Sequence, residues 1–348
     1  MRILFSGGGT IGSVSPLIAI YEEINSSVSG ADFLWLATKE GTENSLISSY
    51  GIPIKKISSG KMRRYFSWRN FLDPFLIVAG FFQALKIIWQ YQPSVVMTAG
   101  GFVSVPVAWA AWVLGKPVTV HQQDIRPGLA NKLMAPVATI ITVTFKKSLK
   151  DFPSKKTTVV GNPVRKDILT ARREEGYKIF NLDPNLPTLL VIGGGTGALS
   201  LNNLVVNSLP QLVQFCQVIH LTGGRLDVEA SHSRYRSFDF LTDQLRYAYA
   251  VADLVITRAG MSSLTELAAW QKPLIVVPIP ETHQEENAAE FFRNNAAVLI
   301  NEKDLNPDIL AKAVRELLDD KPALSNLSRN ITKILPPNAS RKIVELIL

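Results

Sequence analysis

The stretch Thr257–Ala288 reads TRAGMSSLTELAAWQKPLIVVPIPETHQEENA, and its order of elements decides the fold. It follows the apolar run LVIT, turns through small residues between Arg258 and Gly260, enters a predicted helix at Ser262 and returns through a second apolar run, LIVVP. In a doubly wound sheet, such a loop and the N-terminus of the next helix bind anionic ligands. Glu266, on the first turns of that helix, places a carboxylate suited to a ribose diol beside the phosphate site. The stretch therefore predicts a nucleotide site.

Two further stretches repeat the order of strand, glycine loop and helix. The first loop, SGGGTIGS at 6–13, follows an apolar run, and the second, GGGTGA at 193–198, lies about half a chain later. Glycines let backbone N–H groups approach a phosphate closely. The dinucleotide interpretation of either loop is weak. A tight turn without a ligand is the alternative for either loop, but two loops and a third pair, Gly100 and Gly101, favour binding.

Composition and charge limit the class of protein. A chain of 348 residues with 47% apolar residues is long enough for two domains. Residues 1–166 hold 19 Lys and Arg against 8 Asp and Glu, a balance of +11, and the remainder has −3. A basic half suits nucleic acid, an anionic lipid surface or a phosphorylated substrate. Basic residues are not interleaved with stacking aromatics, so nucleic acid is the least favoured partner.

The ends and the cysteine content exclude other classes. A single cysteine, Cys216, excludes a disulfide framework and suits a reducing compartment. The N-terminal MRILFSGGGT predicts a first strand rather than a signal peptide. No stretch approaches the roughly 20 uninterrupted apolar residues of a membrane span.

Polarity and proline content predict the domain boundaries. The most polar and proline-punctuated stretch, 165–187, is expected to be a linker between an N-terminal domain, 1–164, and a C-terminal domain, 188–334. Residues 335–348 predict an amphipathic helix that packs back toward the N-terminal domain. The repeated order of elements predicts that both domains are α/β.

One segment of the basic half combines positive charge with exposed apolar character. The helix predicted between Pro74 and Pro93 is interrupted by polar residues and is too short to span a bilayer readily. Apolar residues beside a basic cluster are typical of an interfacial anchor on an anionic leaflet. A helix buried on both sides is the alternative. The basic cluster is Lys55, Lys56, Lys61, Arg63, Arg64 and Arg69, and the candidate membrane residues are Trp68, Phe75, Leu76 and Phe82.

The run PVTVH predicts a buried strand that delivers HQQD, His121 to Asp124, to the carboxyl edge of a sheet. His121 and Asp124 are two titratable groups at this edge, so they are candidates for general acid and base chemistry. A lone histidine at such a place is more often structural, bonded to a backbone carbonyl.

Six segments in order now carry a resemblance: TAGGFVSVPV, HQQDIRPGLANKL, GNPVR, IGGGTGALSLN, TRAGMSSLTELA and HQEENA. Together they cover nearly the whole chain, which resembles the MurG-type glycosyltransferases. The resemblance implies a GT-B fold, two Rossmann-like doubly wound domains facing across a cleft. It also implies an inverting hexosyltransferase of peptidoglycan synthesis. Such an enzyme moves N-acetylglucosamine from UDP-N-acetylglucosamine to the undecaprenyl-diphosphate-linked muramyl-pentapeptide, at the cytoplasmic face of the membrane and as a peripheral protein.

The resemblance also implies roles for single residues. Glu266 corresponds to the glutamate that binds the ribose, Leu241 to the backbone that reads the uracil, and Gln284 to the glutamine that contacts the sugar. The remaining residues expected at the donor are Thr10, Gly12, Asp124, Arg165, Gly195, Arg258 and Gly260, with Arg258 near the pyrophosphate. The residues expected at the acceptor diphosphate are Gly8, Gly9, Thr10, Gly100 and Gly101. No DxD arrangement is present, so neither a metal nor a cofactor is expected.

The acceptor side departs from the family pattern at two places. The family loop GGTGGH, whose histidine is a proposed base, is GGTIGS here and places Ser13 at that position. The family motif HEQN is HQQD here, so Gln122 and Asp124 replace the acid and the amide. The acceptor hydroxyl needs a base to remove its proton, and Ser13 cannot do so unaided. We hypothesise that Asp124 is the base, directly or through His121.

Other classes of function remain open from the sequence alone. One is a GT-B enzyme with other chemistry, a glycosyltransferase for another lipid acceptor or a UDP-sugar epimerase. Another is a non-catalytic UDP-sugar-binding or membrane-docking subunit, which the altered GGTIGS loop allows. The motifs of the donor site do not separate these classes.

Overall fold

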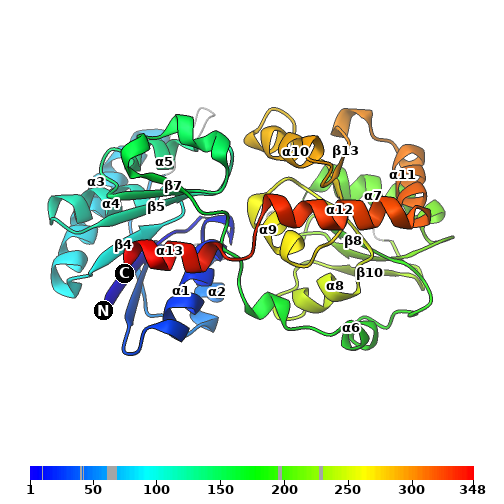
Figure 1. Cartoon of the computed structure of the whole chain (residues 1–348), viewed down its shortest axis with the longest axis horizontal. Helices are drawn as coiled ribbons and strands as arrows, with labels where there is room; N and C mark the ends of the chain where they lie inside the picture. The colour runs from blue at the N-terminus through cyan, green and yellow to red at the C-terminus, as the bar shows by residue number, and fades with distance from the viewer. Residues whose placement is uncertain (10, 40, 42, 61–68, 195–197, 227–229) are drawn as a thin grey trace. The chain divides into compact units, whose positions relative to one another are not determined.

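A computed structural model describes residues 1–348 except 10, 40, 42, 61–68, 195–197 and 227–229. The chain forms two compact units. Figure 1 shows their elements in colours that run from blue at the N-terminus to red at the C-terminus. Unit 1 comprises Met1–Arg165 and Pro337–Leu348, and unit 2 comprises Lys166–Pro336. Each unit is a doubly wound α/β domain, the class that the repeated order of elements predicts.

The sheet of unit 1 is parallel throughout its described strands and has seven of them, in the order β3-β2-β1-β4-β5-β6-β7. Side chains of β1 alternate between the two faces of the sheet. Ile3 and Phe5 therefore enter one apolar core, and Leu4 enters the other. The strands are β1 Arg2–Ser6, β2 Asp32–Thr38, β3 Ile54–Ile57, β4 Val95–Thr98, β5 Val118–Gln122, β6 Ile140–Val143 and β7 Thr157–Val159.

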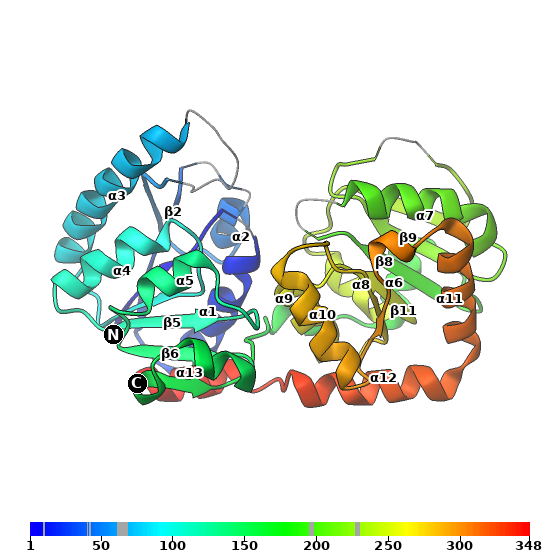
Figure 2. The same ribbon diagram turned by 90° about the horizontal axis from the view of Figure 1, so that it is seen from above.

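Helices cover both faces of this sheet (Figure 2). The core on one face includes side chains of α3, α4 and α5, and the core on the other includes side chains of α1, α2 and α13. Because Ile343 and Val344 of α13 belong to that second core, the last helix of the chain is part of unit 1. The helices are α1 Ser15–Ser27, α2 Glu43–Ser49, α3 Arg69–Tyr91, α4 Ser104–Val113, α5 Leu129–Met134 and α13 Ala339–Ile347, with short 3₁₀ turns η1 Ile11–Ser13, η2 Lys146–Asp151 and η3 Ser154–Lys156.

Unit 2 repeats this winding, and its described strands pair in parallel in the order β10-β9-β8-β11-β12-β13. The strands are β8 Thr188–Ile192, β9 Gln217–Leu221, β10 Tyr235–Phe238, β11 Leu254–Thr257, β12 Leu274–Val276 and β13 Val298–Leu299. The helices are α6 Arg173–Ile179, α7 Leu199–Leu212, α8 Leu245–Val251, α9 Met261–Ala269, α10 His283–Arg293, α11 Pro307–Asp319 and α12 Lys321–Ile334, with η4 Asp167–Leu169 and η5 Glu302–Asp304.

The strand order reverses direction once in each sheet. This switch point lies between β1 and β4 in unit 1 and between β8 and β11 in unit 2. Ligands of doubly wound sheets bind beyond the carboxyl ends of the strands at such a point. The three glycine-rich stretches and the turn from Arg258 to Gly260 each follow one of these four strands.

The segment expected to be a linker is mostly part of unit 2. Lys166–Pro187 clusters with that unit, α6 packs against α8, and the Ile168 carbonyl accepts a 2.9 Å hydrogen bond from Trp270 Nε1. Arg173 Nη2 lies 2.6 Å from Asp253 Oδ1. The polar residues that made this stretch resemble a loop thus include partners of the folded unit.

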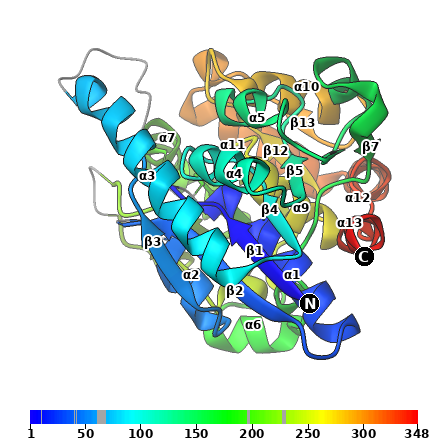
Figure 3. The ribbon, with the colours of Figure 1, turned by 90° about the vertical axis from the view of Figure 1, so that its left-hand side faces the viewer.

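Helix α3 lies along the surface of unit 1, beside α4 (Figure 3). Gly80, Ala84 and Ile88 are buried at a spacing of one helical turn, whereas Phe75 is 75% and Phe82 63% exposed. Leu76 is 40% exposed, and Trp68 lies outside the described residues. By length and composition alone, the Asp73–Tyr91 part of α3 could also cross a membrane. A single helix of this kind is weak evidence of a membrane span.

Candidate functional site

The switch point of unit 2 presents two helix N-termini without side-chain caps. Helix α7 starts after Ala198 and α9 after Gly260, and neither N-cap residue makes a side-chain hydrogen bond. By contrast, side chains cap α10, α11 and α12 in the same unit, from Thr282, Asn306 and Asp320. A helix start whose N-cap residue offers no side-chain acceptor favours an anion, which the helix dipole also attracts. The two starts therefore suit a diphosphate.

Glu266, on α9, is held in a buried position near that start. Its side chain is 5% exposed, and the Tyr249 hydroxyl donates a 2.9 Å hydrogen bond to Glu266 Oε2. Tyr249 itself is buried on α8. This bond fixes the orientation of the carboxylate, which the sequence assigned to a ribose. The sequence did not single out Tyr249, because a tyrosine within the apolar pattern YAYAVAD is indistinguishable from a core residue.

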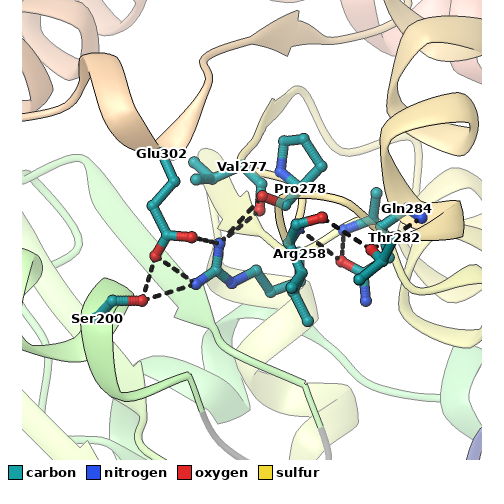
Figure 4. Close-up of polar contacts among 9 residues, drawn as sticks. Ser200, Arg258, Val277, Pro278, Thr282, Gln284 and Glu302 are labelled. Carbon is teal, nitrogen blue, oxygen red and sulfur yellow. Dashed lines mark hydrogen bonds and ion pairs between the residues drawn. The ribbon is translucent and has the colours of Figure 1, made fainter. Parts of the chain in front are cut away.

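The amide of Gln284 is also oriented, by backbone groups. Gln284 Oε1 accepts hydrogen bonds from the Ala259 nitrogen at 3.2 Å and the Ile279 nitrogen at 3.3 Å (Figure 4). Because backbone N–H groups need an acceptor, these bonds identify the amide oxygen and leave the NH₂ group as a donor. Gln284 is half-buried in the first turn of α10, where Thr282 Oγ1 accepts from its backbone nitrogen. A fixed amide donor suits the hydroxyl oxygens of a sugar.

The guanidinium of Arg258 is held by contacts within the protein. Its side chain is only 4% exposed, and its guanidinium forms an ion pair with Glu302, Nη2 to Oε1 2.8 Å (Figure 4). It also donates to the carbonyls of Val277 and Pro278 and to Ser200 Oγ. The sequence placed this guanidinium near the pyrophosphate, but in the structure it is bonded within the protein.

The remaining donor residues are distributed between the two units. Leu241 is half-buried and follows the carboxyl end of β10, and Gly260 is the N-cap residue of α9. Arg165 is buried at the end of the main segment of unit 1, while Gly195 lies outside the described residues. In the described part of the chain, no group of three His, Cys, Asp or Glu side chains could hold a metal ion.

The glycine loop of unit 1 is occupied by a side chain of the protein itself. Glu43, fully buried at the start of α2, accepts at Oε1 from the Gly9 nitrogen at 2.8 Å and from Thr38 Oγ1 at 2.6 Å. Its Oε2 is buried with no hydrogen-bond partner among the described residues. Gly9 was expected to bind the acceptor diphosphate, but its N–H group already has an anionic partner. Sequence reasoning missed Glu43, which lies 34 residues from Gly9.

The other glycines of unit 1 bring its two switch-point loops together. At Gly101, φ is +90°, and a Cβ there would lie 2.7 Å from the Gly8 carbonyl oxygen, so only glycine fits. Gly100 also has a positive φ. The Gly12 carbonyl accepts a 2.8 Å hydrogen bond from Gln123 Nε2. Ser13 is buried and donates to the Gly8 carbonyl at 3.3 Å. Thr10 lies outside the described residues.

His121 is a structural residue of β5. Its Nδ1 lies 3.0 Å from Thr142 Oγ1 and its Nε2 lies 2.8 Å from Asn162 Oδ1, and the ring is buried. Burial lowers the pKa of His121 from 6.5 to about 4, against the opposing effect of the Asn162 bond. The ring is therefore neutral at pH 7, and both its nitrogens are engaged. A proton relay through His121 is not supported by this arrangement.

Asp124 lies three residues beyond His121, after the end of β5. It is half-buried, and its backbone carbonyl accepts a 2.7 Å bond from Gln122 Nε2. Gln122 is itself buried and accepts from Asn131 Nδ2 at 2.6 Å. The amide that replaces the family's acid thus fixes the backbone that carries Asp124, and Asp124 remains the titratable side chain of this motif that is not fully buried.

Comparisons with known proteins agree on one family. Residues 3–143 match the model of the glycosyltransferase family 28 N-terminal domain, and residues 188–342 match that of its C-terminal domain. The UDP-N-acetylglucosamine--N-acetylmuramyl-(pentapeptide) pyrophosphoryl-undecaprenol N-acetylglucosamine transferase of Lachnospira eligens is 37% identical over 326 residues, 92% of each chain.

Two solved structures resemble the whole chain. The crystal structure of Acinetobacter baumannii MurG superposes with a TM-score of 0.73 at 26% identity and covers 99% of this chain and 98% of its own. A UDP-GlcNAc 2-epimerase from Neisseria meningitidis, bound to UDP-GlcNAc, has a TM-score of 0.72 at 14% identity and covers 100% and 99%. The second likeness is one of fold alone.

Proposed function

The chain belongs to glycosyltransferase family 28, and from this premise we propose that it transfers N-acetylglucosamine from UDP-N-acetylglucosamine to undecaprenyl-diphosphate-linked muramyl-pentapeptide. The observation that carries the proposal is the identity of 37% over 92% of the chain to a transferase of that name. The fold is the GT-B type, as expected from the sequence. The enzyme is a hexosyltransferase of peptidoglycan synthesis.

The epimerase alternative has weaker support. Its solved structure matches in fold with a TM-score close to that of the transferase, 0.72 against 0.73, so the fold does not separate the two activities. Sequence does separate them, because identity to the epimerase is 14%. A glycosyltransferase needs a donor site and an acceptor base, and we propose Glu266 and Gln284 for the first and Asp124 for the second.

Unit 2 supplies the donor site in this proposal. Glu266 binds the ribose hydroxyls, the backbone at Leu241 reads the uracil, and the NH₂ group of Gln284 contacts the sugar hydroxyls. The diphosphate lies at the uncapped starts of α7 and α9, where N–H groups and helix dipoles stabilise its charge without a metal. The oriented carboxylate and amide support this assignment.

Asp124 is the general base of the proposed reaction. It takes the proton of the acceptor hydroxyl as that oxygen forms its bond to the anomeric carbon. Removal of the proton makes the hydroxyl oxygen a stronger nucleophile. The bond between the anomeric carbon and the β-phosphate oxygen breaks, and UDP leaves with the electron pair. Attack on the face opposite to UDP inverts the anomeric carbon. The positive ends of α7 and α9 stabilise the charge that develops on the leaving diphosphate.

The exposed aromatic residues of α3 support binding to an anionic membrane surface. Phe75, Phe82 and Trp89 are 75%, 63% and 64% exposed, and α4 adds the exposed Trp109 and Trp112, which the sequence analysis missed. Lys61, Arg63 and Arg64 of the basic cluster lie outside the described residues. Large exposed apolar side chains in a basic half of the chain suit an interfacial site at the cytoplasmic face. The net balance of +11 in residues 1–166 favours anionic lipid.

A transfer assay tests the activity. With radiolabelled UDP-N-acetylglucosamine and the muramyl-pentapeptide lipid, we expect a labelled lipid-linked disaccharide. Free N-acetylmannosamine-type product or UDP release without that lipid would contradict the transferase. Replacement Asp124→Asn should abolish transfer and leave UDP affinity intact, whereas Asp32→Asn, at an exposed carboxylate of the same unit, should leave both unchanged. Normal turnover by Asp124→Asn would overturn the role of Asp124.

Vesicle flotation tests the membrane surface. Binding to vesicles with anionic lipid should exceed binding to neutral vesicles and should weaken as salt rises, because salt screens the basic residues. The double replacement Phe75→Ser and Phe82→Ser should lower binding, and Phe292→Ser, at an exposed aromatic of unit 2, is the matched control. Equal binding by all variants would contradict this surface.

A further inference from the structure

The buried guanidinium of Arg258 joins four segments of unit 2 that are far apart in the sequence. Arg258 itself follows β11, and the carbonyls of Val277 and Pro278 follow β12. Glu302 begins η5, and Ser200 lies in the first turn of α7 (Figure 4). The segments meet at the carboxyl ends of β8 and β11, where the sheet has its switch point.

All four hydrogens on the two terminal nitrogens of Arg258 are committed within the protein. Nη1 donates to Val277 O at 3.1 Å, Pro278 O at 3.3 Å and Glu302 Oε2 at 3.2 Å. Nη2 donates to Ser200 Oγ at 3.1 Å and Glu302 Oε1 at 2.8 Å. Nε is buried and has no partner among the described residues. In this state the guanidinium has no exposed donor for a diphosphate.

Glu302 and Ser200 complete the arrangement around Arg258. The Ser200 hydroxyl donates to Glu302 Oε1 and accepts from Arg258, so its hydrogen-bonding capacity is used on both sides. Partial burial would raise the pKa of Glu302, but hydrogen bonds from Arg258 and Ser200 and the charge of Arg258 lower it below its ordinary value. Glu302 therefore stays ionised at neutral pH and supplies the counter-charge that a buried arginine needs.

The segments held by Arg258 lead directly to groups of the donor site. Pro278 precedes Ile279, whose N–H group donates to the Gln284 amide oxygen. On the other side, Ser200 lies in the uncapped first turn of α7. The guanidinium thus sets the spacing between the residue proposed to contact the sugar and the helix start proposed to hold the diphosphate. The uridine end is held from another element, because the Tyr249 hydroxyl of α8 donates to Glu266 Oε2.

We propose that Glu302 and Ser200 are positioning residues for the diphosphate and sugar of the donor, acting through Arg258. The proposal rests on the donor site assigned above to unit 2. It predicts a specific division of the binding energy: loss of the Glu302 charge displaces the α7 start and Gln284 but leaves the uridine contacts in place. A residue that merely stabilised the fold would affect all parts of the donor alike.

The test compares three ligands on the full-length protein. Dissociation constants for uridine, UDP and UDP-N-acetylglucosamine are measured for Glu302→Gln and Ser200→Ala, together with KM and kcat of transfer. For Glu302→Gln we expect UDP and UDP-N-acetylglucosamine to bind about tenfold more weakly and uridine to be unchanged. The reason is that the charge-assisted contact between Glu302 and Arg258 is lost. KM for the donor should rise by a similar factor while kcat changes little. Ser200→Ala should act in the same direction and less.

Controls separate this proposal from the donor site on which it rests. Glu316→Gln removes an exposed ion pair of the same unit and should change nothing. Glu266→Gln should weaken uridine as well as UDP. If Glu266→Gln has its effect and Glu302→Gln has none, the positioning role is wrong and the donor site stands. If Glu266→Gln leaves uridine and UDP unchanged, the donor site itself is wrong.

Two further results would overturn the positioning role. Equal weakening of uridine and UDP by Glu302→Gln would identify a general defect of unit 2 rather than a positioning defect. Should Glu302→Gln fail to fold, Glu302→Asp keeps the charge and shortens the reach to Arg258, and Ser200→Ala removes only a hydroxyl. An unchanged ratio of UDP to uridine affinity in both of these folded variants would contradict the proposal.

Discussion

The two switch points of the molecule have the same kind of sequence, but at one of them a glycine loop is bonded to a side chain of the protein itself. In unit 1, the N–H group of Gly9 is bonded to the carboxylate of Glu43, a residue of the protein itself. In unit 2, the starts of α7 and α9 have no side-chain cap. A glycine loop at the end of a strand therefore does not by itself identify a phosphate site. A loop of this kind is available to a phosphate only where no side chain from elsewhere in the chain already satisfies its N–H groups.

Acid should weaken both units, because each contains one buried neutral histidine. Burial lowers the pKa of His121 and of His220 from 6.5 to about 4. Between these pH values the unfolded chain takes up a proton that the folded chain does not, so stability is complete above pH 6.5 and falls toward pH 4. The loss should be on the order of 3 kcal/mol for each histidine. Denaturant unfolding measured from pH 7 to 4.5 tests this, and a flat profile would contradict it.

Removal of the carboxylate in the unit 1 loop should destabilise that unit without changing the donor. Glu43→Ala leaves the Gly9 N–H and the Thr38 hydroxyl without their acceptor and opens a cavity, which should cost about 2 to 3 kcal/mol. Glu43→Gln keeps an acceptor oxygen and should cost less. Thermal unfolding and UDP titration are the two measurements. A change in UDP affinity with unaltered stability would reverse the assignment of the two loops.

Glu266→Gln should reduce donor affinity and leave stability nearly unchanged, which is the opposite of the pattern expected for Glu43→Ala. A neutral amide makes a weaker contact with the ribose hydroxyls than a carboxylate, so UDP should bind more weakly by roughly 2 kcal/mol, about thirtyfold. Stability should change little, because the amide still accepts the Tyr249 bond. Binding of a 2′,3′-dideoxy analogue of UDP, which lacks the hydroxyls, should be equal in the variant and the parent. A variant that loses both ligands equally would contradict the ribose role.

Tyr249→Phe should give the smallest effect of the series. It removes the hydroxyl that orients Glu266 and leaves the ring in place, so UDP affinity should fall by about 1 kcal/mol, five- to tenfold. The effect should disappear in the Glu266→Gln background if the two residues act through one contact. Tyr247→Phe on the same helix is the control. Additive losses in the double variant would show that Tyr249 acts elsewhere.

The sequence predicted the order of the elements better than it predicted the partners of single side chains. Glu266 and Gln284 could be placed because each lies a few residues beyond a strand, where the chain itself fixes the position. Partners that come from remote segments could not be placed. Glu302 is 44 residues from Arg258, so the spacing that identified a cation near a helix start gave no sign of its counter-charge.

Polar residues caused the main errors for the same reason. The stretch 165–187 was expected to be a linker because of its polarity, but Arg173 pairs with Asp253, 80 residues away, and all of the stretch after Arg165 belongs to unit 2. His121 could have been a base or a core residue from sequence, and only its contacts with Thr142 and Asn162 favour the second. In each case the deciding information is tertiary.

Amide hydrogen exchange with and without UDP tests the central difference between the two switch points most directly. UDP should slow exchange in the first turns of α7 and α9, where the N-cap residues Ala198 and Gly260 provide no side-chain cap. The Gly9 amide should exchange at the same rate with and without UDP, because Glu43 is already its partner. Protection of Gly9 together with unchanged exchange at the starts of α7 and α9 would contradict the account.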